Sequence, residues 1–383
     1  MTGQKFSFYN NQVDLVRVLV KTAVLFLLAN LIFAWVYPMP ALGQISAYNH
    51  IFPGRLRLPY GDNPEKAYNL SLFNLDAMFA SHELARRPKE ADEFRVIFIG
   101  DSSTWGYLLE NKDTLTGKIN AANLQLPDGR KIHSYNLGYP VMSLTKDLTL
   151  LSYAMRYQPD LIIWPFTLES FPIDKQLFPP LLQNNSSVVQ NILDQYQLKV
   201  GNPAKELKSP SFLDKTIIGS RRSLADLARL QIYGILWSAT GIDQDIPEDY
   251  PSRQEDLESK TIYHGLNPGQ MTQKDLALDV LASGIKMAGE TPVILINEPM
   301  FISQGKNSDI RYNFYYPRWA YDTYRHIMSE ASSENKWAYY DYWNLVPSSE
   351  FTNSAVHMSP QGTSIFANQI IELILQKAEA KHG

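Results

Sequence analysis

The chain has 383 residues; 45% of them are hydrophobic and 19% are charged, and the formal net charge is -4. This length fits about two to three average domains or one large elaborated domain. The small acidic charge gives no basic surface for DNA or RNA, so we exclude nucleic acid as a partner. The chain contains no cysteine, which excludes disulfides and thiolate metal sites.

The first predicted element is an apolar run from Leu15 to Tyr37, which has the length of a membrane span, about 20 residues. Arg17 and Lys21 lie near its start and aromatic residues lie at its far end, so the positive-inside rule places the N-terminus in the cytoplasm. We therefore expect residues 1–40 to form a cytoplasmic tip and a transmembrane anchor, with the rest of the chain outside the cytoplasm.

Two other interpretations of this run stay open. The sequence Ala41-Leu42-Gly43 is compatible with the cleavage site of a signal peptide, and an apolar helix also occurs in protein cores. We favour the uncleaved anchor, which makes the chain a single-pass membrane protein with an extracytoplasmic body.

Residues 41–93 are rich in Pro, Asn, Tyr and Arg. We interpret them as a connector of loops that leads into a helix at about residues 70–87. His82 lies in this helix, and we interpret it as a structural histidine rather than a part of the site.

An alternation of strands and helices begins at residue 94. Helical patterns at residues 144–157 and 364–376 lie among five short apolar runs that have the composition of strands. The predicted strands are residues 95–99, 132–137, 161–164, 292–296 and 337–342. Strands that alternate with helices form a parallel sheet covered on both faces. We therefore predict an α/β fold over residues 94–383, a three-layer sandwich of the flavodoxin-like type with a central parallel sheet.

Residues 171–266 interrupt this alternation, and we predict that they form a helical insertion. An amphipathic helix is expected within residues 212–240, with leucines and isoleucines on its apolar face. We interpret the insertion as a lid over the carboxyl edge of the sheet. The apolar face of its helix would rest either on the body or on the bilayer beside the anchor.

The strand at residues 95–99 stops at Gly100-Asp101-Ser102, which leaves a serine at the carboxyl end of a buried strand. Open α/β sheets carry their chemistry at this edge, and a serine there becomes a nucleophile when a histidine accepts its proton. The alternative is an ordinary strand-to-helix junction, in which Asp101 or Ser102 caps the following helix.

His357 lies a few residues before the helix predicted at residues 364–376, whose start also lies at the carboxyl edge of the sheet. Of the seven histidines, it is the best placed to act as the base for Ser102. The sequence has no phosphate-binding glycine loop and no metal-ligand spacing, so we expect neither a cofactor nor a metal.

Together these motifs resemble the SGNH, or GDSL, hydrolase superfamily, over residues 94–168 and 291–374. The segments similar to the first, second and last blocks of that family are Gly100 to Gly106, Asn136-Leu137-Gly138, and His357 with Pro360 and Gly362. The resemblance implies that Ser102 is the nucleophile and His357 the general base. It also implies that the backbone amides of Ser102 and Gly138 donate to the oxyanion.

The sequence departs from this family at two places. The third block of the family ends in an asparagine that donates to the oxyanion, whereas Glu169 stands nearest to that position here. The family also has an aspartate three residues before the histidine, and here that residue is Ser354. The candidates for orienting His357 are therefore Ser354, Asn353, a backbone carbonyl, Asp341 and Glu298.

Several further residues are candidates for the site. An ionised Glu169 beside an oxyanion would be unfavourable, so we expect it to point away, to be protonated or to contact substrate hydroxyls. Asn297 follows a predicted strand and is a candidate oxyanion donor or a turn residue. The cluster of aromatic residues at 312–324 is either a wall for sugar stacking or ordinary packing. The oxyanion or orienting candidates are Gly138, Asp101, Asn297 and Ser354; the substrate-lining candidates are Glu169, Trp105 and Tyr139.

We therefore predict a serine-dependent esterase or O-acyltransferase that acts on an acylated cell-surface glycan or envelope polymer through an acyl-enzyme. Members of the family that this architecture resembles act beside membrane-bound O-acyltransferases, so such an enzyme is a candidate partner. The alternative is a catalytically weak or inactive domain that binds glycan or that partner.

Overall fold

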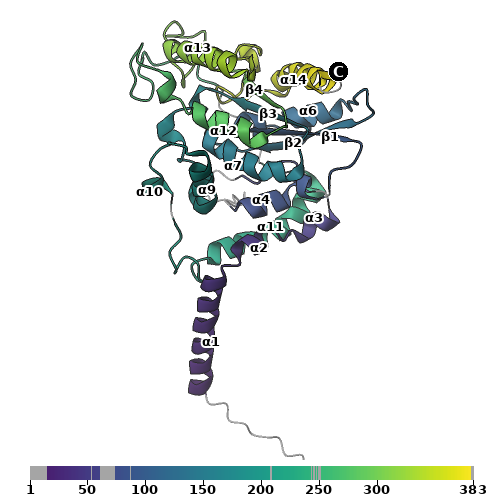
Figure 1. Ribbon diagram of the computed structural model, residues 1–383, viewed down its shortest axis with the longest axis vertical. Coiled ribbons are helices and arrows are strands. Elements are labelled where there is room, and N and C mark those ends of the chain that lie inside the picture. Colours follow the sequence, from purple (N-terminus) through teal and green to yellow (C-terminus); the bar gives the residue numbers. More distant parts are fainter. Residues whose placement is uncertain are drawn as a thin grey trace, which may run out of the picture.

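Five parallel strands form one sheet in the order β2-β1-β3-β4-β5 in the computed structural model of the chain (Figure 1). The structure describes residues 15–52, 54–60, 74–86, 88–207, 209–242, 244, 246, 248 and 252–380. The strands are β1 Glu93–Gly100, β2 Lys131–Gly138, β3 Leu161–Phe166, β4 Val293–Asn297 and β5 Ala338–Asp341. These bounds agree closely with the five predicted strands, so the predicted parallel α/β fold is confirmed.

Helices cover both faces of the sheet because successive strand side chains point to opposite faces. In β1, Ile97 and Ile99 belong to one apolar cluster, whereas Val96 and Phe98 belong to the other. The helices of the first face are α7 Leu144–Ala154, α12 Leu278–Ala288 and α13 Arg318–Asn335; those of the second are α6 Leu115–Ala121 and α14 Pro360–Ala380. The result is the predicted three-layer sandwich.

Part of the expected connector belongs to the core of this body. Leu58 is fully buried, and its carbonyl accepts a hydrogen bond of 2.8 Å from Trp105 Nε1. The described part of the helix expected at residues 70–87 consists of α4 Leu75–Ser81 and a 3-10 turn, η1 Glu83–Ala85. Residues 70–73 lie outside the described residues. Asn74 caps α4 through its side-chain oxygen, which accepts from the amide of Ala77.

The apolar run at the start of the chain forms one helix, α1 Leu15–Val36, which projects from the body (Figure 1). It has 22 residues and a mean hydropathy of 2.1, and 11% of its most apolar stretch is buried in the protein. The helix is thus long and apolar enough to cross a membrane, and its apolar surface is largely uncovered. Two short helices, α2 Met39–Gly43 and α3 Ala47–Ile51, follow it.

The insertion is helical, but its longest helix does not cover the carboxyl edge of the sheet. The helix expected at residues 212–240 is α11 Arg221–Thr240, and it packs on α2, α3 and α4 at the end of the body beside α1 (Figure 1). Turns precede it from residue 212 to residue 220. The amphipathic pattern predicted the helix but could not specify what its apolar face would contact. The other α-helices of the insertion are α8 Pro180–Asn184, α9 Ser186–Tyr196 and α10 Pro203–Glu206.

Candidate active site

Ser102 and His357 meet at the carboxyl edge of the sheet, although 255 residues separate them. Ser102 is the first residue of a short helix, α5 Ser102–Trp105, directly after β1 ends at Gly100. His357 lies on the loop between β5 and α14. The His357 Nε2 atom is 2.9 Å from Ser102 Oγ, which is hydrogen-bonding distance for a base and its nucleophile.

Asn353 holds the other ring nitrogen of this histidine. Its side-chain oxygen, Oδ1, lies 2.9 Å from His357 Nδ1. Because an amide oxygen only accepts, Nδ1 carries the ring proton and Nε2 presents its lone pair to Ser102. Of the orienting candidates left open by the sequence, Asn353 therefore occupies the position. Ser354 instead hydrogen-bonds with the hydroxyl of Tyr315.

The imidazole of His357 is held in its neutral form. Burial lowers its pKa from the ordinary 6.5 to about 4, because the charged imidazolium loses its hydration there. The ring of Tyr107 lies against it with 4.9 Å between the ring centres. A neutral imidazole at neutral pH is the form that accepts a proton from serine.

Replacing the amide beside this ring by a carboxylate is expected to change its titration. In Asn353→Asp, a negative charge next to Nδ1 stabilises the imidazolium, and charges at this distance raise a pKa by about 1–3 units. Activity requires neutral His357 and is lost as the pH falls through its pKa. The acid limb of kcat/KM should therefore move to higher pH, measured with a short-chain aryl ester; an unmoved limb would show that another group titrates. Asn353→Ala is the control, because it adds no charge.

Two of the expected oxyanion donors, the Gly138 amide and the Asn297 side chain, are engaged within the protein. The amide of Gly138 donates to Asn136 Oδ1 at 3.0 Å. The side chain of Asn297 is fully buried; its Nδ2 donates to Asp341 Oδ1 at 2.8 Å, and its Oδ1 accepts from Tyr321. Asn297 thus joins β4 to β5 and α13 rather than facing the serine. The backbone amide of Ser102, at the start of α5, remains our proposed donor to the oxyanion.

A close approach of two elements explains the glycine at position 138. A Cβ atom added there would lie 2.5 Å from the backbone nitrogen of Trp105 and 2.8 Å from the carbonyl carbon of Thr104. We expect Gly138→Ala to push α5 away from β2, with a loss of stability of about 1–3 kcal/mol for such overpacking. Thermal unfolding would measure it. Ser349→Ala, a change of an exposed serine, is the control and should unfold like the wild type.

Two buried carboxyl groups, Asp101 and Glu298, support the turn that carries the nucleophile. Both bind Ser103, whose amide donates to Asp101 Oδ1 at 2.8 Å and whose hydroxyl donates to Glu298 Oε2 at 2.5 Å. Their remaining oxygens, Asp101 Oδ2 and Glu298 Oε1, are buried and have no hydrogen-bond partner in the described part of the chain. Burial, followed by the charge of Asp101, raises the pKa of Glu298, which favours the protonated form of this carboxyl group.

A buried lysine lies beside this pair. Lys146 Nζ donates to the carbonyls of Gly100 at 2.7 Å and Tyr139 at 2.6 Å, and it forms an ion pair of 2.7 Å with Asp147. Burial raises the pKa of Asp147 to about 6, although the charge of Lys146 opposes this effect. Lys146 thus connects the ends of β1 and β2, where the nucleophile turn begins. The sequence did not predict that Lys146 supports the site.

Glu169 is ionised and lies in a cavity of about 330 Å³. Burial alone would raise the pKa of its carboxyl group, but hydrogen bonds from His264 and Lys175 outweigh burial and lower it. Tyr263 donates to the same carboxylate at 2.9 Å. The other residues that line the cavity are Gln254, Glu258, Lys260, Ile262, Arg311, Phe314 and Tyr315. The insertion therefore reaches this edge of the sheet through residues 254–264, not through α11.

Trp105 and Tyr139, two of the predicted substrate-lining residues, are almost completely buried. Trp105 is 1% exposed and is covered by the guanidinium of Arg57 at 4.6 Å from its ring; Tyr139 is 2% exposed. The side chains of Trp105 and Tyr139 therefore lie in the core and do not line the site. His82 is also fully buried, and its ring binds the backbone of β2 at Asn136.

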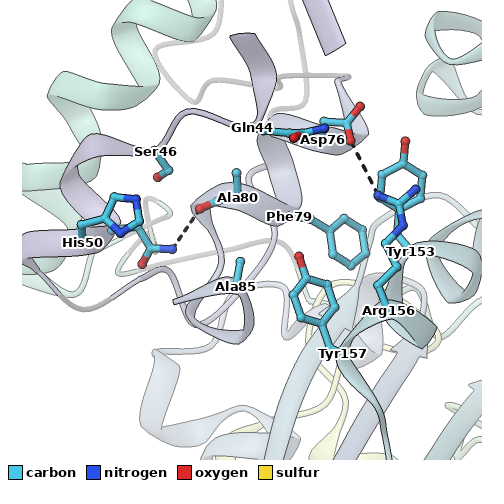
Figure 2. Close-up of a pocket in the computed structure, with 11 residues that line it drawn as sticks. Gln44, Ser46, His50, Asp76, Phe79, Ala80, Ala85, Tyr153, Arg156 and Tyr157 are labelled. Carbon is cyan, nitrogen blue, oxygen red and sulfur yellow. Dashed lines mark hydrogen bonds and ion pairs between the residues drawn. The ribbon is translucent and has the colours of Figure 1, made fainter. Parts of the chain in front are cut away.

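A second hollow, of about 280 Å³, lies between the α2–α3 connection, α4 and α7 (Figure 2). Figure 2 shows Asp76 facing Arg156, with 3.8 Å between their charged groups, and the rings of Phe79 and Tyr157 beside them. None of the predicted site residues lines this hollow. Within the described residues, no group of three or more histidine, aspartate or glutamate side chains could hold a metal ion.

No protein-family model and no curated protein matches the chain. Solved structures do, among them members of the lipolytic G-D-S-L family, which is the family that the sequence motifs resemble. The one from Veillonella parvula is 11% identical over 73% of this chain and 96% of its own, with a TM-score of 0.35. An aryl esterase of M. smegmatis is 12% identical over 73% and 97%, with a TM-score of 0.34. A catalytic mutant of an acetylxylan esterase from Geobacillus stearothermophilus is 11% identical over 73% and 92%, with a TM-score of 0.35.

Proposed function

We propose that the chain is a serine-dependent esterase or O-acyltransferase that works through an acyl-enzyme. The observation that carries this proposal is the distance of 2.9 Å between Ser102 Oγ and His357 Nε2, with Asn353 fixing the opposite ring nitrogen. An acceptor nitrogen at this distance, in a ring that is neutral, can take the proton of a serine hydroxyl as the oxygen attacks.

In the proposed reaction, Ser102 Oγ bonds to the carbonyl carbon of an ester while His357 Nε2 takes its proton. The tetrahedral intermediate then collapses, and His357 returns the proton to the departing alcohol. Water or a second alcohol next loses a proton to His357 and attacks the acyl carbon. The bond from this carbon to Ser102 Oγ then breaks, and His357 returns the proton to Ser102 Oγ. Water completes a hydrolysis, and an alcohol completes an acyl transfer.

We propose an acylated glycan or envelope polymer as the substrate. The cavity at Glu169 supports this class, since it combines a carboxylate, basic side chains and the rings of Phe314 and Tyr315. Sugar hydroxyls bind to carboxylates and basic groups, and the apolar faces of sugars pack on aromatic rings. Glu169 then contacts substrate hydroxyls, which is one of the roles that the sequence left open for it.

We also propose that α1 anchors this activity at a membrane, with the N-terminus in the cytoplasm and the body outside. The support is the uncovered apolar surface of α1, the basic residues Arg17 and Lys21 in its first turns, and Trp35 in its last turn. In this position the body is available to a membrane-bound O-acyltransferase, which we retain as a candidate partner.

One observation favours the alternative of a weak or inactive binding domain. Two of the groups expected to stabilise the oxyanion, the Gly138 amide and the Asn297 side chain, are bonded within the protein. Removal of a single oxyanion donor lowers kcat by about 10²–10³ in a serine hydrolase. A domain with this defect would still bind glycan through the cavity at Glu169.

Labelling with a fluorophosphonate probe distinguishes these functions, because the probe reacts with a serine only when a base has activated it. We expect the wild-type chain and Ser349→Ala, a change of an exposed serine, to be labelled, and Ser102→Ala and His357→Ala to remain unlabelled. Equal labelling of Ser102→Ala, or no labelling of the wild type, would contradict the proposal. Acetylated glycans, incubated with and without an added alcohol acceptor, then separate hydrolysis from transfer.

A further inference from the structure

The exposed apolar side chains of the body are concentrated at one end. Outside α1, most of the large apolar residues that stay exposed belong to two segments, residues 45–56 and 212–246. Elsewhere in the described residues, Tyr37, Phe178 and Ile262 have this property. The exposed apolar residues of the two segments are Ile45, Ile51, Phe52, Leu56, Phe212, Leu213, Ile218, Ile232, Ile235, Leu236, Ile242 and Ile246. Soluble surfaces rarely gather apolar residues in this way without a partner.

These two segments pack together. α11 contacts α2 and α3, and the side chain of Gln231 accepts from the amide of Ala47 at 2.8 Å and donates to the carbonyl of Ile45 at 3.0 Å. Leu230 and Leu227 of α11 are buried in this contact with Met39. One side of α11 therefore rests on the body, while Ile232, Ile235 and Leu236 remain 64%, 45% and 52% exposed.

Residues 212–218 also lie beside the C-terminal turns of α1. The amide of Ile218 donates to Asn30 Oδ1 at 3.2 Å, and Lys215 Nζ lies 5.5 Å from the centre of the Tyr37 ring. Figure 1 shows α2 and α11 at the end of the body from which α1 projects. The exposed apolar residues Phe212, Leu213 and Ile218 thus belong to a segment that adjoins the exposed surface of α1.

The contact with Asn30 shows where along α1 residues 212–218 lie. Asn30 precedes the end of α1 at Val36 by six residues, which corresponds to about 9 Å at 1.5 Å per residue. A helix of 22 residues is about 33 Å long, and the hydrocarbon core of a bilayer is about 30 Å thick. If α1 spans the bilayer, Ile218, which is level with Asn30, therefore lies roughly 7 Å inside the edge of the hydrocarbon core, and Lys215, beside Tyr37, lies at that edge.

We propose that this surface, formed by residues 45–56, residues 212–218 and the exposed side of α11, is embedded in the extracytoplasmic interface of the membrane that α1 spans, with the lipid bilayer as its partner. The proposal rests on α1 as a membrane span. Exposed basic residues of α11, Arg221 and Arg229, lie beside the apolar side chains, as in helices that bind anionic headgroups. The body then has one fixed orientation relative to the membrane and does not rotate freely about its connection to α1.

The absence of cysteine makes this proposal directly testable, since one introduced cysteine is the sole site for a spin label. Four full-length variants are needed: Leu213→Cys and Leu236→Cys on the proposed surface, Leu25→Cys in α1, and Glu334→Cys on α13 at the opposite end of the body. Each is labelled and reconstituted in vesicles of phosphatidylcholine and phosphatidylglycerol. Power saturation then compares collisions with oxygen, which concentrates in lipid, and with a water-soluble nickel chelate.

We expect labels at positions 213 and 236 to collide preferentially with oxygen, as at position 25, and the label at position 334 to collide several-fold more often with nickel. Nickel-dominated collisions at 213 and 236, with oxygen-dominated collisions at 25, would overturn this proposal but leave the anchor intact. Nickel-dominated collisions at position 25 would overturn the anchor itself. Spin–spin broadening at 213 or 236 would show instead that a second copy of the chain covers the surface.

Discussion

Replacing Ser102 by alanine is expected to lower kcat/KM for a short-chain ester by about 10⁴-fold or more, which is typical for the loss of a serine nucleophile. The replaced hydroxyl is the group that lies 2.9 Å from the base. His357→Ala should have a similar effect because the two groups act as a unit. The double variant should then lose no more activity than either single variant.

The measurement is steady-state kinetics on purified full-length protein, with folding verified by circular dichroism. Ser349→Ala, an exposed serine outside the site, is the matched control and should keep wild-type kinetics. Activity that persists in Ser102→Ala would exclude the acyl-enzyme. Losses that add in the double variant would mean that Ser102 and His357 act independently.

The second large effect is expected on stability, from Lys146→Met. Lys146 is fully buried, and its removal leaves Asp147 and the carboxyl pair of Asp101 and Glu298 without their neighbouring positive charge. Breaking a buried ion pair by removing one partner costs about 3–5 kcal/mol. It also leaves the carbonyls of Gly100 and Tyr139 without a donor.

Denaturant unfolding of the full-length protein in detergent would measure this loss. Lys274→Met, a change of an exposed lysine, is the control and should alter the free energy of unfolding by less than about 0.5 kcal/mol. Addition of Asp147→Leu to Lys146→Met should recover part of the stability, since the uncompensated charge is then also removed. An unaltered midpoint in Lys146→Met would mean that water reaches this site.

The strands and the serine–histidine pair were predictable because each depends on local patterns. A continuous apolar run such as residues 95–99 has the signature of a buried strand, and the glycine after it predicts the turn. His357 precedes a helix that packs on the sheet, so its position follows from the topology. The residue that orients His357 depends on the conformation of one loop, which no periodicity encodes, and the sequence accordingly left Asn353 among several candidates.

The buried charges and the position of α11 were not predictable in the same way. Lys146 and Asp147 lie in a helix where a charged pair indicates a solvated face, and only packing against β1 and β3 buries them. For α11, the amphipathic pattern predicted one apolar face, but the helix has a second exposed apolar side. Trp105 follows the serine by three residues and Tyr139 follows the end of a neighbouring strand, yet their side chains point into the core.

The separation of Ser102 and His357 by 255 residues has a consequence for folding. Contacts between distant parts of a chain form late, because closing a long loop costs entropy before the contact is gained. α14, which follows His357, packs on α6 and covers one face of the sheet. Until that helix docks, the sheet exposes an apolar face and the serine has no base. In the proposed enzyme, Ser102 is therefore activated only once α14 covers this face of the sheet.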